Sequence, residues 1–302
     1  MPLVRVHVGN TVHSLYHGDC LDIMSKLAGY AGLTCICSPP YNIGKEYNTD
    51  ADDVSREDYL AWSAKWMGEV KRLVKGGHFF LNMGSKPSSP LGPFQVLSEA
   101  IKLGFVLQNH FAWVKSITTT LSQGQFKPLN SGRYVNDLWE PVFHLTETGN
   151  VPINRYHPDV AVPHQDQTNV TRWATGRKVR CRGNVLFAPY ETVQSREERV
   201  GAHPASFPER LVELLLGLAT PPPTNDPDAP TTTPIAPTPT VLDPFAGSLT
   251  TAVVAVHKGW NSVMIEEDET YFLAGVARVV EAAKAVGEPQ VTMSVADTVW
   301  PP

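Results

Sequence analysis

The feature that most constrains the fold is the C-terminal stretch VLDPFAGSLTTAVVAVHKGWNSVMIE, residues 241–266. Its pattern predicts a buried strand, a tight loop around Gly247, an apolar helix and a second strand that ends in Glu266. In βαβ folds, an acid about twenty residues after a glycine loop, at the tip of the next strand, binds the ribose hydroxyls of an adenosine. The stretch therefore predicts a βαβ unit with an adenosine site at the carboxyl ends of its strands.

The loop lacks the glycine spacing of pyrophosphate binders. Leu249 and Thr250 follow Gly247 and Ser248, so no G-x-G-x-x-G is present, and the chain contains no G-x-x-x-x-G-K-[ST] phosphate loop. The expected ligand is thus an adenosine without a pyrophosphate. S-adenosylmethionine fits that description.

Strand and helix patterns alternate over the N-terminal third of the chain. A short apolar strand at 34–37 ends at Pro39 and Pro40, because neither proline can donate a ladder hydrogen bond. Ser55 followed by Asp58 resembles a capping box, and apolar positions at helical spacing continue from there to Val74. This alternation predicts the α/β class, with a doubly wound, mostly parallel sheet.

The pattern also divides the chain. Residues 1–145 are expected to form one half of the core, and 203–219 together with 241–302 the cofactor-binding half. Between them, 146–202 is irregular and rich in Arg, Asn, Gln and His, which indicates an inserted recognition segment. Residues 220–240 are almost wholly Pro, Thr, Ala and Asp, so a linker without a core of its own is expected.

The charge distribution indicates a polyanionic partner in spite of a formal net charge of −5. Two stretches, 100–136 and 171–182, contain lysine or arginine and no acid, which favours one face that docks on a polyanion. Four cysteines without a C-x-x-C pair predict neither a disulfide framework nor a metal site. No apolar run approaches the roughly 20 residues of a membrane span, and no secretory signal is evident. A cytoplasmic protein without membrane association is expected.

Three motifs together resemble one family. They are SPPYN at 38–42, HPASFPERL at 203–211 and DPFAGSLTT at 243–251, with weaker matches at HGDC (17–20), FAWVKS (111–116) and LWEPVF (138–143). In this order they resemble the β-class amino-methyltransferases of DNA, and the resemblance spans nearly the whole chain. It implies a Rossmann-like methyltransferase fold with an inserted target-recognition segment. The chain departs from the pattern in its long 220–240 linker and at Leu249, where the family usually has a second glycine.

The resemblance implies methyl transfer from S-adenosylmethionine to the exocyclic amino group of a base flipped out of duplex DNA. Ser38, Pro39, Pro40 and Tyr41 would be the catalytic residues. The Ser38 hydroxyl and the Pro39 carbonyl would accept the amino hydrogens, and the Tyr41 ring would stack on the base. In this family a serine before the prolines occurs mostly with cytosine N4 as the target. N4-methylcytosine is therefore the favoured product, and N6-methyladenine is the alternative.

The remaining expected contacts belong to the cofactor and to DNA. The cofactor-binding residues would be Asp19, Cys20, Ser38, His203, Phe207, Asp243, Pro244, Phe245, Ala246, Gly247, Thr250, Thr251 and Glu266. The DNA-binding residues would be Lys115, Lys127, Arg133, Arg172, Arg177, Lys178, Arg180 and Arg182. Double-stranded DNA is the expected partner, a cognate restriction enzyme is a candidate partner, and the chain is expected to be a monomer or homodimer.

Three questions stay open on the sequence alone. A methyltransferase acting on RNA or on a small-molecule amine could use a similar motif, although in those families the cofactor motif usually comes first. A DNA- or S-adenosylmethionine-binding protein without catalysis is a further alternative, for which Leu249 is the only indication. Asp19 could be a plain cap at a strand end instead of a cofactor contact.

Overall fold

The structure is a computed structural model that describes residues 2–43, 54–116, 131–163, 178–189, 208–222 and 238–295. The strands of its main sheet are β1 (Pro2–Val8), β2 (Thr11–His17), β4 (Thr34–Cys37), β6 (His78–Asn82), β7 (Val106–Val114), β8 (Trp139–Thr146), β11 (Val185–Phe187), β12 (Thr240–Asp243), β13 (Asn261–Glu266) and β14 (Gln290–Val295). The helices are α1 (Cys20–Met24), α2 (Arg56–Leu73), α3 (Gly92–Lys102), α5 (Glu209–Ala219), α6 (Thr250–Lys258) and α7 (Glu269–Val286). Two short pairs lie outside this sheet: β3 (Tyr30–Ala31) with β5 (Val74–Lys75), and β9 (Val162–Pro163) with β10 (Val179–Arg180).

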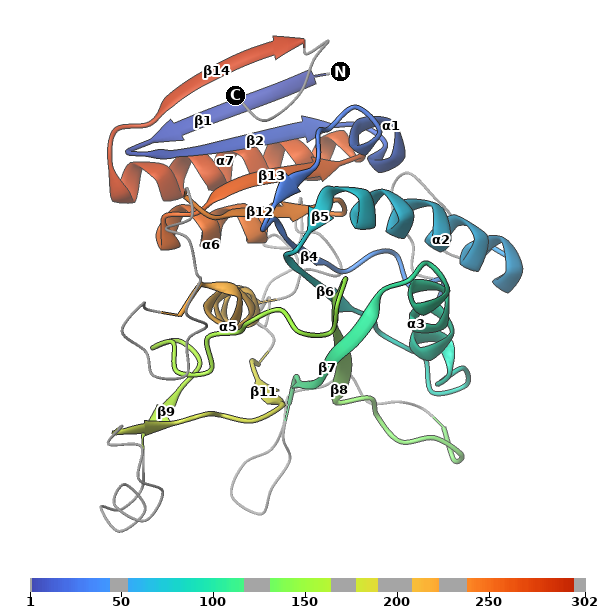
Figure 1. Ribbon diagram of the computed structural model, residues 1–302. Coiled ribbons are helices and arrows are strands. Elements are labelled where there is room, and N and C mark those ends of the chain that lie inside the picture. The colour runs from blue at the N-terminus through green and yellow to red at the C-terminus, as the bar shows by residue number, and fades with distance from the viewer. Residues whose placement is uncertain are drawn as a thin grey trace.

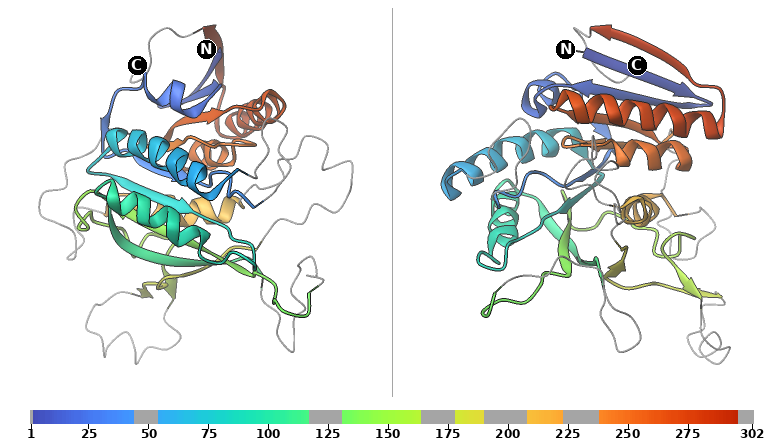
Figure 2. Two further views of the ribbon diagram at one scale, coloured as in Figure 1. Left: turned by 90° about the vertical axis from the view of Figure 1, so that its right-hand side faces the viewer. Right: turned by 180° about the vertical axis from the view of Figure 1, so that it is seen from behind.

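Within these residues the main sheet has the order β11-β7-β8-β6-β4-β12-β13-β2-β1-β14 (Figure 1). Its five central strands, from β6 to β2, run parallel to one another. Helices α2 and α3 cover one face, and α5, α6 and α7 cover the other (Figure 2). The predicted doubly wound, mostly parallel α/β class is confirmed.

The strand order reverses between β4 and β12. From β4 the chain passes through α2 to β6 on one side, whereas from β12 it passes through α6 to β13 on the other. In open α/β sheets, ligands bind at such a reversal, just outside the carboxyl ends of the strands. The topology alone therefore places a site where β4 and β12 end.

Helix α2 shows how closely local signals fix an element. The amide N–H of Asp58 donates to the Ser55 hydroxyl at 3.1 Å, so the predicted cap is confirmed. The helix ends at Leu73, before the predicted glycines, because the next two residues are extended and pair with β3. Gly76, with φ +64°, then turns the chain toward β6.

The 146–202 segment does not lie wholly outside the core. It supplies β11, which pairs in parallel with β7. Leu186 and Ala188 are buried against the sheet, and the Trp113 indole N–H donates to the Ala188 carbonyl at 2.8 Å. At the opposite edge, β1 and β14 add an antiparallel extension that the sequence patterns did not predict.

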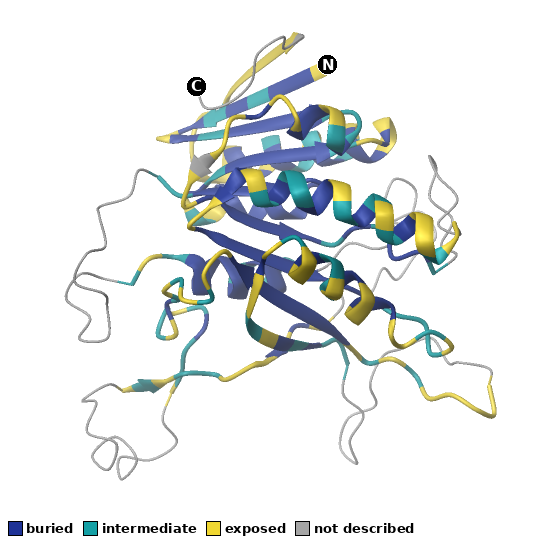
Figure 3. Cartoon of the chain, turned by 45° about the vertical axis from the view of Figure 1, so that its right-hand side comes forward, coloured by how far each residue is buried: buried dark blue, intermediate teal, exposed yellow. Residues whose placement is uncertain are grey.

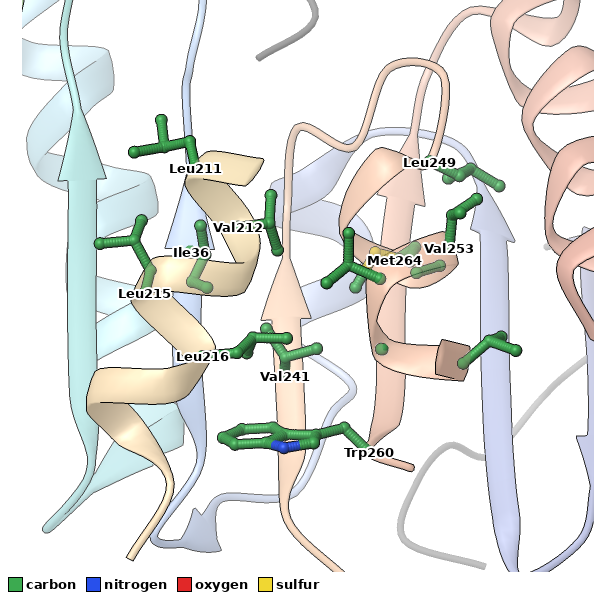
Figure 4. Packing of buried hydrophobic residues seen from close by; sticks show 14 of the residues in the cluster. Ile36, Leu211, Val212, Leu215, Leu216, Val241, Leu249, Val253, Trp260 and Met264 are labelled. Atoms are coloured by element: carbon green, nitrogen blue, oxygen red, sulfur yellow. The ribbon is translucent and has the colours of Figure 1, made fainter. Parts of the chain in front are cut away.

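The core consists of two hydrophobic clusters, one on each face of the sheet. Burial is concentrated in the central strands, whereas exposed residues lie on the outward sides of the helices and on β14 (Figure 3). Leu211 and Leu215 of α5 pack with Ile36 and Val241, next to Met264 (Figure 4). Helix α5 thus covers the point at which the strand order reverses. Among the described helices, none is both long and apolar enough to span a bilayer.

Buried histidines should make the protein less stable in mild acid. Desolvation by burial lowers the pKa of His13 to about 4, that of His78 to about 4 and that of His144 to about 3. Since an unfolded histidine titrates near 6.5, the unfolded state binds more protons as the pH falls through that value toward 4. We expect each histidine to lower the free energy of unfolding by on the order of 1–2 kcal/mol between pH 7 and pH 5.

Asp243 has the opposite effect on the pH dependence of the free energy of unfolding. Burial raises the pKa of this carboxyl from 3.8 to about 7, so the folded state holds the extra proton between these values and gains stability as the pH falls. In Asp243→Asn this opposing contribution is removed, and the loss of stability in acid should become steeper than in the wild type. Urea unfolding of the wild type and of Asp243→Asn at pH 7.5, 6 and 5 measures how steeply the stability of each protein falls with pH. An Asp243→Asn protein whose stability stays flat over this range would contradict the account.

Candidate functional site

Five segments meet at the carboxyl edge of the parallel strands. Asp19 follows β2, residues 38–41 follow β4, Asn82 ends β6, residues 243–249 follow β12, and Glu266 ends β13. Because parallel neighbours end at the same edge, motifs more than 200 residues apart along the chain face one another. The sequence-predicted catalytic and cofactor motifs therefore lie side by side.

The loop after β12 is held by Asp243. One carboxyl oxygen accepts the amide N–H of Phe245 at 3.1 Å, and the other accepts the Thr251 hydroxyl at 2.7 Å. Gly247 has φ +51°, a backbone conformation that favours glycine. Asp243 and Thr251 thus shape the loop through contacts within it, and Pro244, the residue after Asp243, is buried.

Glu266 closes the loop from the neighbouring strand. The amide N–H of Gly247 donates to Oε2 at 2.6 Å, and that of Asp268 donates to Oε1 at 2.9 Å. Burial raises the pKa of the Glu266 carboxyl, and the two backbone donors act against this shift. A carboxylate has roughly four acceptor positions, so the two that remain suit the two hydroxyls of a ribose. These acceptor positions thus fit the adenosine ligand expected from the sequence.

Leu249, the residue that departs from the family motif, turns away from the strand tips. It adopts a left-handed conformation (φ +59°, ψ 31°) and is fully buried against α7 (Figure 4). The facing residue on α7 is Gly275, where an added Cβ would lie 2.4 Å from Leu249 Cγ. The leucine is therefore accommodated by a glycine on the neighbouring helix, and its side chain belongs to the core.

This packing predicts a compensating pair. Gly275→Ala should lower the free energy of unfolding by about 1–3 kcal/mol through overpacking, and Leu249→Gly in the same chain should restore part of that loss. Gly68→Ala in α2 is the matched control, because an added Cβ there meets no atom within 4 Å. Chemical denaturation compares the variants. If Gly275→Ala were no less stable than Gly68→Ala, the contact would not have the proposed role.

Other cofactor-motif residues are fixed by contacts with helix α2 and strand β13. The Phe245 ring packs on Trp62 and Trp66 of α2, at centroid distances of 5.6 and 5.1 Å. The amide N–H of Ala246 donates to the Ile265 carbonyl at 2.9 Å. The Phe245 contacts join the cofactor-binding half of the core to the half that carries the catalytic motif.

Arg278 of α7 stabilises the cofactor loop, a role that sequence reasoning missed. Its guanidinium donates to the Ser248 carbonyl at 2.6 Å and to the Thr250 hydroxyl at 3.2 Å. It also forms an ion pair with Glu209 at the start of α5, with 3.4 Å between Nη2 and Oε1. Arg278 therefore ties the cofactor loop to α5, the helix that follows the HPASFP motif.

At the end of β2, Asp19 has the role of a cap. Its Oδ1 accepts the amide N–H of Asp22 at 2.8 Å, at the start of α1. The preceding Gly18 donates its N–H to the Glu266 carbonyl at 2.9 Å, which keeps this turn beside the cofactor loop. Cys20 is buried in the core, and burial raises the pKa of its thiol. The placement brings Asp19 to the site, and a cofactor contact of Cys20 stays a prediction.

The SPPY motif forms a rigid corner. The Ser38 and Tyr41 hydroxyl oxygens lie 2.5 Å apart. The Tyr59 hydroxyl donates to the Pro40 carbonyl at 2.7 Å, which fixes the corner to α2. Asn42 has φ +54°, and its amide exchanges two hydrogen bonds of 2.9 Å with the backbone of Val54. The backbone around Ser38 is thus held from both sides.

Tyr41, whose ring is expected to stack on the base, is itself largely buried. It is only 7% exposed, and its ring lies against Gly84, where an added Cβ would be 2.3 Å from Cε2. Its hydroxyl lies 3.3 Å from both Asn82 Oδ1 and Glu140 Oε2. In this conformation Tyr41 is a wall of the site, and stacking on a base stays a prediction.

Lys115, one of the expected DNA contacts, is paired with an acid at the site. Its ammonium lies 3.0 Å from Glu140 Oε1, and the two side chains are only 11% and 9% exposed. The ammonium thus pairs with a buried carboxylate at the site, and a contact of Lys115 with DNA stays a prediction.

Four other predicted cations lie nearer the surface. Arg133 is exposed, stacks over the Tyr134 ring at 5.2 Å and precedes β8 at the edge that carries the SPPY motif. Lys178 and Arg180 are exposed at β10, and the Arg182 guanidinium donates to the Val160 carbonyl at 3.1 Å. Five predicted residues lie outside the described residues: Lys127, Arg172, Arg177, His203 and Phe207. Within the described ranges, no cluster of three or more potential ligand side chains could hold a metal ion.

Comparison with known proteins agrees with this geometry. A family model described as a DNA methylase, of the N6 and N4 type, matches residues 34–276. The type II methyltransferase M.ScaI of Streptomyces caespitosus is 28% identical over 290 residues, which cover 90% of this chain and 83% of that protein. The DNA adenine methyltransferase YhdJ of Escherichia coli is 24% identical, over 90% of this chain and 84% of that protein.

Solved structures show the same fold. The PvuII DNA methyltransferase, described as cytosine-N4-specific, superposes with a TM-score of 0.61 at 18% identity, over 92% of this chain and 93% of that one. A DNA modification methylase from Thermus thermophilus, in complex with S-adenosyl-L-methionine, gives a TM-score of 0.53 at 19% identity, over 91% and 96% of the two chains. At these identities the likeness concerns the fold.

Proposed function

The chain belongs to the DNA methylase family of N6- and N4-amino methyltransferases, and on this premise we propose that it methylates N4 of cytosine in double-stranded DNA. The family makes it an S-adenosylmethionine-dependent enzyme that acts on DNA. The choice of cytosine rests on one observation: a serine, Ser38, occupies the first position of the motif at the carboxyl end of β4. The fold likeness to a cytosine-N4-specific enzyme is in keeping with that choice.

Adenine N6 is the second candidate. A relative of similar coverage is a DNA adenine methyltransferase, and a hydroxyl can accept a hydrogen bond from either exocyclic amine. Ser38 distinguishes the two only through the family pattern, in which an aspartate or asparagine occurs mostly with adenine. The proposal for cytosine therefore needs a test that separates the bases.

In the proposed reaction the residues bind, orient and exclude water. When bound, S-adenosylmethionine supplies an electrophilic methyl group on a sulfonium. Glu266 would hold its ribose, and the 243–249 loop would hold its position relative to Ser38. The lone pair of an exocyclic amine is delocalised into the base, so hydrogen bonds to the Ser38 hydroxyl and the Pro39 carbonyl would turn it toward the methyl group. Such a mechanism needs no covalent intermediate with the base.

DNA would approach the carboxyl edge of the sheet. A base within a duplex cannot reach Ser38, so the target would be flipped out of the helix. Arg133 beside the site, and Lys178 with Arg180 at β10, would contact the phosphates or base edges. These assignments for the described cations are part of the proposal.

The proposal is tested with two pools of mixed-sequence duplex DNA, amplified with N4-methyl-dCTP in place of dCTP or with N6-methyl-dATP in place of dATP. Labelled methyl transfer should be lost in the first pool and retained in the second, with unmodified DNA as the reference. Loss in the N6-methyladenine pool alone would identify adenine as the target.

A further inference from the structure

We propose that Glu140 is a positioning residue that fixes the direction of the hydrogen bond between Ser38 and Tyr41. It would do so by accepting hydrogen bonds around Tyr41, so that the Ser38 hydroxyl donates inward and presents its lone pairs to the substrate amine. This inference rests on the proposed function, because it concerns the same site and the same transfer of a methyl group to an exocyclic nitrogen.

The amide of Asn82 has a defined orientation. Its Nδ2 lies 3.0 Å from Glu140 Oε2 and 3.4 Å from the Pro141 carbonyl, two groups that can only accept. The nitrogen therefore faces these oxygens, and Oδ1 of the same amide faces Tyr41. Glu140 thus determines which atom of Asn82 meets the tyrosine.

The Tyr41 hydroxyl then has two acceptors on its inner side. Asn82 Oδ1 and Glu140 Oε2 each lie 3.3 Å from Tyr41 Oη, and neither can donate to it when Glu140 is a carboxylate. These two acceptors favour an inward direction for the single hydroxyl hydrogen of Tyr41. Across the 2.5 Å between Ser38 Oγ and Tyr41 Oη either hydroxyl can donate, and we infer from the inner acceptors that Ser38 donates and Tyr41 accepts.

This direction matters for an amine substrate. A serine hydroxyl has one hydrogen and two lone pairs. With its hydrogen committed to Tyr41, Ser38 has both lone pairs available for an amino hydrogen of the base. In the reverse direction Ser38 would accept from Tyr41, and its own hydrogen would be free to point at the amine and compete for the nitrogen lone pair that has to attack the methyl group.

Lys115 pairs with the carboxyl oxygen of Glu140 that faces away from Tyr41. Its Nζ lies 3.0 Å from Oε1, whereas Asn82 and Tyr41 both use Oε2. Glu140 is buried, and the removal of one partner of a buried ion pair is strongly destabilising. The Lys115 ammonium would also orient a glutamine introduced at position 140, through a hydrogen bond. Lys115 would hold the amide oxygen, and the amide N–H₂ would face Tyr41 and reverse the hydrogen bond.

A double-mutant cycle with Glu140→Gln and Tyr41→Phe tests the inference. Each single variant should lower kcat on duplex DNA by about 10- to 100-fold, the factor that corresponds to one hydrogen bond to a charged group. The KM for S-adenosylmethionine should stay within about twofold of wild type. Because Glu140 acts through Tyr41, the double variant should be no slower than the slower single variant.

The matched control is Asp137→Asn, an exposed acid near the same edge that accepts the Ser85 hydroxyl at 3.0 Å. Its kcat should equal that of wild type. If Glu140→Gln does not fold, as judged by thermal unfolding, the cycle is run with Tyr41→Phe and Ser38→Ala, which should also be non-additive.

The outcomes distinguish a failure of the proposed function from a failure of the inference about Glu140. Wild-type protein that transfers no methyl group to DNA would overturn the proposed function and this inference together. An active wild type whose losses multiply in either cycle, or a Glu140→Gln protein with wild-type kcat, would overturn the inference alone.

Discussion

Ser38→Ala is expected to lower turnover on duplex DNA by about 100- to 1000-fold, the range for the loss of one preorganised hydrogen-bonding group at a reacting centre. The hydroxyl lies at the end of β4, on a corner fixed by Tyr59 and Asn42, so its removal should leave the backbone in place. The affinity for S-adenosylmethionine should change by less than about threefold, because Glu266 and the 243–249 loop carry the proposed cofactor contacts.

The matched variant is Ser85→Ala, which removes a hydroxyl hydrogen-bonded to Asp137 near the same edge of the sheet. Its turnover should be that of wild type. Single-turnover rates at saturating DNA, together with cofactor titration, distinguish a catalytic loss from a binding loss. Wild-type turnover in Ser38→Ala would remove this residue from the catalytic role.

Glu266→Gln should weaken S-adenosylmethionine binding by about 10- to 100-fold, the factor that corresponds to one hydrogen bond to a charged group. Both carboxylate oxygens accept a backbone N–H, from Gly247 and Asp268. A glutamine of the same shape would place its N–H₂ against one of these donors, so the loop would lose a contact in addition to a ribose acceptor. At saturating cofactor, kcat should fall much less than the affinity.

Glu267→Gln is the control for this prediction. The EEDE run at 266–269 leaves the register of the acid uncertain by one position on the sequence alone. In the structure Glu266 bonds to the glycine loop, and Glu267 is exposed. Calorimetric titration should show near wild-type affinity for Glu267→Gln. Equal affinities for the two variants would contradict the assignment.

Most of the fold was predictable because its signals are local. The cap at Ser55, the prolines after β4 and the glycine loop after β12 each mark an element boundary within a few residues. Parallel strands then bring those boundaries to one edge without further information. Helix α2 ended early because β5 pairs with β3, a contact between segments distant in the sequence that no local pattern reveals.

The residues that sequence reasoning missed all act across elements. Glu140, Arg278 and Gly275 have unremarkable neighbours in the sequence, and their roles arise only when β8 or α7 packs beside a motif. Lys115 was assigned to DNA because it lies in an acid-free stretch, yet its partner, Glu140, lies 25 residues further along the chain. Spacing along the chain could not show that the two strands pair antiparallel.

The central claim is tested most directly by identifying the product. The protein is incubated with mixed-sequence duplex DNA and labelled S-adenosylmethionine, the DNA is digested to nucleosides, and the labelled nucleoside is identified by mass. The account predicts N4-methylcytosine in wild type and a strong decrease in Ser38→Ala. N6-methyladenine would contradict the reading of Ser38, and the absence of any methylated nucleoside despite measurable cofactor binding would contradict the proposed function as a whole.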